Sequence, residues 1–197
     1  MSMSGSEKIG PERERLNFVN AVTERFGFLS EWGFSMTESL PTLVRYRNGE
    51  IGVDVYHGRQ SYELGFGVER LGVRYPLATL IRAIDPEAEQ EYRNFAATTP
   101  DVVANGLTQL AELVKRYGEP ALRGDAEFFA RLDKQRVEWA EGYALDVLAR
   151  QLRPKADAAF REGRYREAAE LYERIRPRLT PAELKKLTLA KNRAQPK

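Results

Sequence analysis

The residues whose types suit chemistry gather in one stretch, IGVDVYHGRQSYELGFGVER, at positions 51–70. Asp54 and Glu63 supply carboxylates there, and His57 is the only histidine of the 197-residue chain. Two neighbouring carboxylates can share a proton, serve as an acid and a base, or bind a hard cation with further oxygen ligands. A nearby arginine would instead turn the pair into a structural or partner-facing charge cluster. The sequence alone leaves these alternatives open.

The composition excludes several other kinds of site. The chain has no cysteine, which rules out disulfides, thiolate zinc sites and a cysteine nucleophile, and one histidine cannot form a multi-histidine metal site. Gly65, Gly67 and Gly72 lack both the GxGxxG spacing and the following Lys-Ser/Thr of phosphate-binding loops. We therefore expect no cofactor, no metal and no catalytic residues.

The elements that carry these residues are predicted to form an antiparallel sheet. Over residues 34–68 apolar side chains recur at every second position, as in strands with one buried face. The Asn48-Gly49 pair favours a two-residue turn centred on it, and residues 57–60 form a second turn. Counting outward from the second turn gives an expected core face of Val53, Val55, Tyr62, Leu64 and Phe66.

The same count predicts which residues share the reverse face of the sheet. It places Asp54 opposite Glu63 and Gly52 opposite Gly65, beside Arg45. Like charges directly opposite each other destabilise a sheet, and Arg45 is in position to compensate them.

Three glycines, at positions 52, 65 and 67, are predicted to lie on this reverse face and to leave a row of positions without side chains. Strand glycines commonly mark the close approach of another backbone. We therefore expect something flat to lie there, either a helix of the same chain or a partner protein. His57 is expected to be a solvated turn residue. The predicted partner-binding residues are Arg45, Asp54, Tyr56, His57, Arg59 and Glu63.

Helices are predicted before and after the sheet. Residues 11–26 have the apolar spacing of an amphipathic helix, and the chain is predicted to be helical from residue 75 onward. Capping residues before a proline mark helix starts at Asp85, Thr99 and Thr180, the last within a capping box. A helical stripe that is expected to be core consists of Phe128, Leu132, Trp139, Tyr143 and Val147.

The segment KADAAFREGRYREAAELYERI resembles the second half of a tetratricopeptide-repeat hairpin. Gly163, Tyr165, Ala168 and Tyr172 stand at its turn glycine, aromatic, small and second aromatic positions. A repeat protein needs about three such units, and one is seen, so an ordinary helical hairpin docked on the domain is the alternative. The rest of the chain, including YRNFAATTP, resembles uncharacterised bacterial α+β proteins of the immunity type, which implies a toxin as partner and no family active site.

Charge is distributed unevenly along the chain. Residues 1–150 hold 18 Lys/Arg against 23 Asp/Glu, a net charge of −5, and residues 151–197 hold 13 against 6, a net charge of +7. The basic segment suits RNA, an acidic partner or the protein's own acidic sheet. Its interleaved glutamates favour surface ion pairs between neighbouring helix turns.

These observations predict an α+β fold with an N-terminal helix, a small antiparallel meander of three or four strands and a mainly helical C-terminal half. The expected parts are a flexible leader at 1–10, a helix plus sheet at 11–74, a helical part packed on the sheet at 75–150, and the tetratricopeptide-like hairpin at 151–197. No apolar run approaches the ~20 residues of a membrane span, and no signal peptide is seen, so a cytoplasmic location and no membrane contact are expected.

The function that these patterns favour is non-catalytic protein binding of a bacterial type, with an immunity-like or antitoxin-like role. Two alternatives remain. One is a helical adaptor that binds RNA or an acidic partner through residues 151–197. The other is an enzyme that uses the carboxylates of Asp54 and Glu63.

Overall fold

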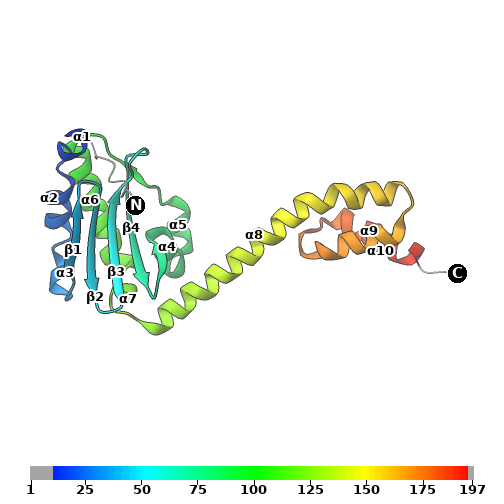
Figure 1. The fold of residues 1–197 in the computed structure, drawn as a ribbon. Coiled ribbons are helices and arrows are strands. Elements are labelled where there is room, and N and C mark those ends of the chain that lie inside the picture. The colour runs from blue at the N-terminus through cyan, green and yellow to red at the C-terminus, as the bar shows by residue number, and fades with distance from the viewer. Residues whose placement is uncertain (1–10, 195–197) are drawn as a thin grey trace, which may run out of the picture. The chain divides into compact units, whose positions relative to one another are not determined.

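The computed structural model describes residues 11–194, so the predicted leader at 1–10 lies outside the described residues. The chain divides into two compact units, residues 1–132 and 133–197 (Figure 1). The boundary falls inside helix α8 (Ala126–Arg161), whereas the sequence placed the C-terminal part from residue 151. Each unit is described by itself below.

The N-terminal unit contains an antiparallel sheet, as predicted, but with six strands instead of three or four. Five strands follow one another in the order β1-β2-β3-β4-β5, and β6 pairs with β4 next to β5 along the same edge. The strands are β1 (Ser35–Leu40), β2 (Leu43–Asn48), β3 (Ile51–His57), β4 (Glu63–Arg70), β5 (Val73–Pro76) and β6 (Phe95–Ala96).

The two strands that the sequence reading missed are short. β5 overlaps the predicted helical start at residue 75, and it follows a tight turn in which Leu71 and Gly72 have φ of 51° and 77°. Two successive positive φ values are typical of a type I′ hairpin. β6 has two residues, too few for any alternating pattern to be recognised.

The helices of the N-terminal unit are α1 (Pro11–Glu14), α2 (Phe18–Arg25), α3 (Phe28–Glu31), α4 (Leu77–Ile84), α5 (Pro86–Glu91), α6 (Pro100–Tyr117), α7 (Glu119–Leu122) and the start of α8. The predicted helix over 11–26 is interrupted at Asn17, whose φ of 53° is left-handed. The predicted caps form, because Asp85 accepts a hydrogen bond from the Ala88 amide and Thr99 accepts one from the Val102 amide.

The strand register differs from the prediction, although the faces do not. Gly49 takes the first loop position, with φ of 55°, so Asn48 pairs with Ile51 and the first hairpin is offset by two residues. A longer loop between β3 and β4 offsets the second hairpin by four, which brings Asp54 opposite Gly67. Even offsets preserve the side of each residue, because side chains alternate with a period of two.

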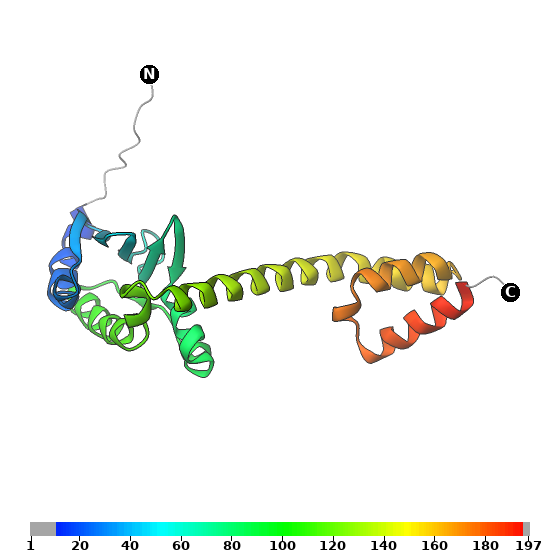
Figure 2. The ribbon, with the colours of Figure 1, turned by 90° about the horizontal axis from the view of Figure 1, so that it is seen from below.

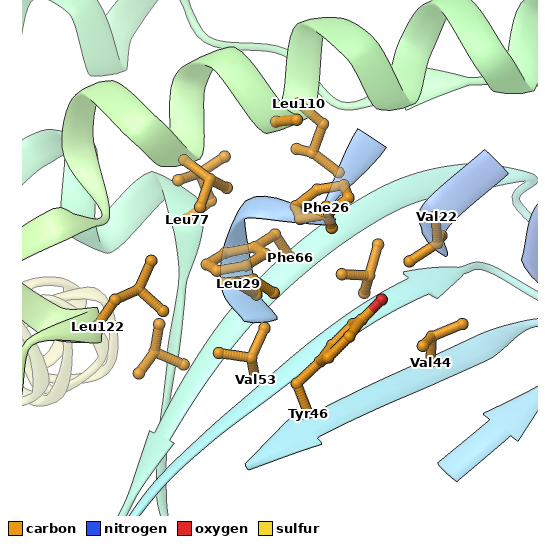
Figure 3. Close-up of a cluster of buried hydrophobic side chains, with 14 of the residues drawn as sticks. Val22, Phe26, Leu29, Val44, Tyr46, Val53, Phe66, Leu77, Leu110 and Leu122 are labelled. Carbon is orange, nitrogen blue, oxygen red and sulfur yellow. The ribbon is translucent and has the colours of Figure 1, made fainter. Parts of the chain in front are cut away.

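The predicted core face of the sheet is therefore confirmed for Val53, Val55, Leu64 and Phe66, which are buried. Tyr62 is half-buried and lies in the loop before β4. Helices α2, α4 and α6 pack on this face (Figure 2). Figure 3 shows the resulting layer, in which Phe26, Leu29, Leu77 and Leu110 surround the strand residues Val44, Val53 and Phe66. Each such side chain contributes about 1.5–3 kcal/mol through burial.

The C-terminal unit is a helical hairpin followed by a third helix. Its elements are α8 from residue 133, α9 (Tyr165–Arg174), the 3₁₀ turn η1 (Arg176–Arg178) and α10 (Pro181–Ala194). The predicted capping box forms: the Thr180 amide donates to Glu183 Oε2 at 2.7 Å, and the Glu183 amide donates to Thr180 Oγ1 at 3.3 Å. Arg153 of α8 also binds Glu183 at 2.7 Å, which ties α8 to the start of α10.

Small residues hold the helices of this unit close together. Gly163 makes the turn with φ of 77°, and Ala156, Ala159 and Ala168 are fully buried beside Tyr172. The Tyr172 hydroxyl donates to Asp157 at 2.6 Å. Two members of the predicted core stripe are not core, since Trp139 and Tyr143 on α8 are exposed. They lie outside the alanine-rich cluster.

We expect Gly49→Ala to lower the free energy of unfolding by roughly 1 kcal/mol, because an L side chain is strained at positive φ. A Cβ at this position would meet nothing within 4 Å. The change in the free energy of unfolding would therefore come from backbone strain and not from a steric clash. Urea unfolding of the full chain measures it. Gly52→Ala is the matched control, since its Cβ would make ordinary 3.5 Å contacts. An equal loss in both variants would contradict the turn assignment.

We expect Ala168→Trp to destabilise the C-terminal unit by about 1–3 kcal/mol, because the position is fully buried between helices and has no room for an indole. Thermal unfolding followed by circular dichroism would detect the change. Glu170→Trp places the same side chain on the exposed side of α9 and serves as control. Equal melting of both variants would show that α9 does not pack through Ala168.

Candidate functional site

The reverse face of the sheet carries a network of ion pairs centred on Asp54. Arg45 Nε binds Asp54 Oδ1 at 2.9 Å, and Arg45 Nη1 binds Glu38 Oε2 at 2.6 Å. From β5, Arg74 approaches the second Asp54 oxygen at 3.6 Å. The Asp54 side chain is 15% exposed and the Arg45 side chain is 49% exposed, so the carboxylate lies beneath guanidiniums that face solvent. Its hydrogen bond to Asp54 raises the pKa of Arg45 above its ordinary value.

The glycine positions on this face are filled by neighbouring side chains. The Tyr56 ring lies across Gly65, where a Cβ would overlap it, and the Arg74 guanidinium lies across Gly67, where a Cβ would be 2.7 Å from Nε. The Arg74 guanidinium is 4.9 Å from the centre of the Tyr56 ring, a cation–π contact. Side chains from β3 and β5 therefore cover these two glycines, where a helix of the chain or a partner protein was expected.

The predicted Asp54–Glu63 pair does not form. Asp54 faces Gly67, and Glu63, four residues earlier at the start of β4, pairs with Ala96 of β6. The error came from the loop length between β3 and β4, which no local pattern specified. An acid–base pair of these two carboxylates is thus ruled out. Among residues 11–194, no three His, Cys, Asp or Glu side chains gather in a way that would hold a metal ion.

Glu63 instead has aromatic surroundings. Tyr92, which follows α5, lies near both Tyr56 and Glu63. Burial raises the pKa of Tyr92 to about 12, and the charges of Tyr56 and Glu63 add to this shift. Tyr56 therefore lies between the Asp54 cluster, which it contacts through Arg74, and the end of β4 that carries Glu63.

His57 is buried, which corrects the expectation of a solvated turn residue. It is the last residue of β3, and its Nε2 lies 2.8 Å from the Ala97 carbonyl and 3.0 Å from the Tyr62 carbonyl. Its Nδ1 lies 3.1 Å from Arg13 Nη1. Because the guanidinium can only donate, Nδ1 accepts and Nε2 carries the proton, so the imidazole is neutral. Burial lowers its pKa, and the Arg13 charge adds to this effect.

Arg13 completes this buried cluster and was not anticipated. It is 8% exposed, and its guanidinium donates to the carbonyls of Gly58 and Arg59 and stacks on the Tyr62 ring at 3.8 Å. The Arg59 residue is exposed. Both ring nitrogens of His57 and both terminal nitrogens of Arg13 have partners within the protein, so these two side chains fasten the loop between β3 and β4.

Two further residues of the reverse face were missed by the sequence reading. Arg47 lies 3.7 Å from Glu69 across the sheet, and Arg74 comes from β5. The alternation that identified Arg45 would also have identified Arg47, two positions later. Arg74 had no such signal, because its segment was assigned to the start of a helix.

The basic C-terminal segment forms some ion pairs between neighbouring helix turns, as its interleaved glutamates predicted, and others between different helices. The pairs join Arg153 to Glu183, Arg164 to Glu162 and Glu167, Arg166 to Glu170, Arg176 to Glu173, Lys186 to Asp157 and Lys191 to Glu173. These ion pairs engage Lys and Arg side chains that would otherwise be available to bind the phosphates of a nucleic acid.

No protein-family model matches the sequence, and neither a curated protein nor a solved structure matches it. Within residues 11–194, every helix is too short or too polar to cross a membrane.

We expect acid to weaken the N-terminal unit through His57. Because burial lowers the folded-state pKa, the stabilisation is complete above the ordinary pKa of about 6.5 and is lost as the pH falls from that value through the lower pKa of the folded state. A proton on Nδ1 would face the Arg13 guanidinium. The free energy of unfolding can change by at most about 1.4 kcal/mol per pH unit, because a single proton is involved.

Urea unfolding at neutral and mildly acidic pH measures this effect. His57→Gln keeps an amide near the same carbonyls and has no titration in this range, so its stability should change less between the two pH values. Since the chain has one histidine, the difference between the two proteins isolates that group. Identical pH dependence in both proteins would contradict the assignment.

Proposed function

We propose that this protein is a non-catalytic binding protein that recognises another protein through the reverse face of its sheet. The observation that supports this most directly is the charged, prearranged surface formed by Arg45, Tyr56 and Arg74. Each of the two guanidiniums is about half-exposed and is held in place by Asp54 beneath it. Side chains that are ordered before association lose less conformational entropy on binding.

The surface also has the chemistry of a specific protein interface. Arginine and tyrosine are enriched among residues that dominate binding energy, and both occur here on a rigid sheet. Helices α2, α4 and α6 pack on the opposite face of the sheet (Figure 2). Guanidiniums that already neutralise Asp54 can still donate to carboxylates of a partner, because each has five N–H groups.

The resemblance to bacterial immunity-type proteins supports a finer version of this proposal, in which the partner is a toxin and the protein is a cytoplasmic immunity-like or antitoxin-like inhibitor. An inhibitor of this kind needs shape and charge complementarity and no reacting groups. The adaptor alternative, in which residues 151–197 bind RNA, is disfavoured by the ion pairs of that segment.

Affinity capture from the native host, followed by mass spectrometry and reconstitution with the purified partner, tests the proposal. We expect Arg45→Glu with Arg74→Glu to reduce affinity for the reconstituted partner by at least about tenfold, since reversed charges at an interface repel the groups they once attracted. Tyr56→Ala should weaken binding without a change of charge. Binding by the wild type should also weaken with added salt.

The matched control is Arg166→Glu with Lys185→Glu, which makes the same change of charge on exposed positions of the C-terminal unit. Circular dichroism verifies that all variants remain folded. Full affinity in both the reverse-face charge variant and Tyr56→Ala would refute the proposal. Loss of binding in the control pair alone would assign recognition to the basic helices instead.

A further inference from the structure

Helix α8 presents two large aromatic side chains to solvent in the C-terminal unit. Trp139 is 63% exposed and Tyr143 is 55% exposed. Their rings are stacked, with centres 5.6 Å apart and planes inclined by 12°. They are four positions apart in the sequence, so they lie one turn apart on the same side of the helix. Large apolar side chains that form a contiguous exposed patch often mark an interaction site.

The opposite side of α8 is already occupied. Leu148, Ala149 and Leu152 pack against Ile175, Leu171 and Leu179 of the following elements. Leu148 comes nine residues after Trp139, and Leu152 nine residues after Tyr143, which at 3.6 residues per turn places each pair about half a turn apart. The aromatic side chains therefore project away from α9, and their unit supplies no cover for them.

The sequence around these residues is complementary to itself when two helices run in opposite directions. Trp139 and Tyr143 lie two positions before and after residue 141, and Arg136 and Asp146 lie five positions before and after it. A twofold axis near residue 141 would thus bring Trp139 beside Tyr143 of a second copy and Arg136 beside its Asp146. Within one copy Asp146 binds Arg178 at 2.6 Å and Arg136 lies 3.4 Å from Asp133, so the contact between copies would extend these ion pairs.

A parallel arrangement in register would be unfavourable, because it places Arg136 next to the same arginine of the other copy. Isolated helices of about 12–15 residues are marginal in water, so the unpacked stretch of α8 would itself gain from a partner. Two tryptophans and two tyrosines bury about 150–250 Å² each, which amounts to a small interface of the weak, reversible kind.

We propose that residues 136–146 of α8 form an antiparallel homodimer contact with a second copy of this chain. The proposal is independent of the protein-binding function of the sheet. It predicts a monomer–dimer equilibrium in the micromolar concentration range. The contact uses the face of α8 that lies opposite the packed leucines.

Sedimentation equilibrium of the full chain across the micromolar range tests the association. We expect a reversible dimer, and at least about a tenfold higher dissociation constant for Trp139→Ala with Tyr143→Ala. The matched control is Leu184→Ala with Leu189→Ala, which removes two equally apolar, 40% exposed side chains from α10. A monomer at every concentration, or a dimer that the aromatic variant leaves unchanged, would overturn the proposal.

Fluorescence and cross-linking test the geometry. The chain has two tryptophans, so Trp32→Phe leaves Trp139 as the only reporter, and its emission should shift to the blue as the dimer forms. Emission that is already blue in the monomer would show that Trp139 is covered within one chain. Because the chain lacks cysteine, Arg136→Cys and Asp146→Cys can be oxidised separately or mixed. A disulfide in the mixture alone is expected, and a disulfide in Arg136→Cys alone would overturn the antiparallel arrangement.

Discussion

The buried guanidinium of Arg13 is the interaction on which the arrangement of the N-terminal unit depends. A cation that leaves water needs hydrogen-bond partners, and Arg13 donates to the carbonyls of Gly58 and Arg59 and to Nδ1 of His57. His57 extends the connection to the carbonyl of Ala97, beside β6. Helix α1, the loop between β3 and β4, and the edge of the sheet are thereby held by one cluster, which also keeps the imidazole neutral.

Arg13 fastens the loop between β3 and β4, and this loop sets the register of the two strands. The register in turn decides which side chains are neighbours on the reverse face. With Tyr56 opposite Gly65 and Asp54 opposite Gly67, an aromatic ring and a guanidinium each find space above a glycine. A shift of two residues would keep every side chain on its face but would separate these neighbours. The binding surface that we propose is thus a consequence of a buried cluster at the end of the strands.

The two units solve the problem of burial in different ways. The sheet unit buries phenylalanines, leucines and valines between one layer of helices and one face of the strands. The helical unit has few large apolar residues and relies on alanines, which allow helices to approach closely around Tyr172. Trp139 and Tyr143 of α8 are not used in this packing and remain exposed. Association with another copy of the chain explains this exposed aromatic pair.

The sequence by itself determined what is local. The caps at Asp85, Thr99 and Thr180 formed, the side of each strand residue was correct, and Gly49 and Gly163 took positive φ, because these features depend on neighbours in the chain. Tertiary structure decided the pairing of Asp54, the burial of His57 and the exposure of Trp139. Each depends on a partner distant in sequence, or on the lack of one in its unit, and neither alternation nor helical spacing specifies how far apart such partners lie.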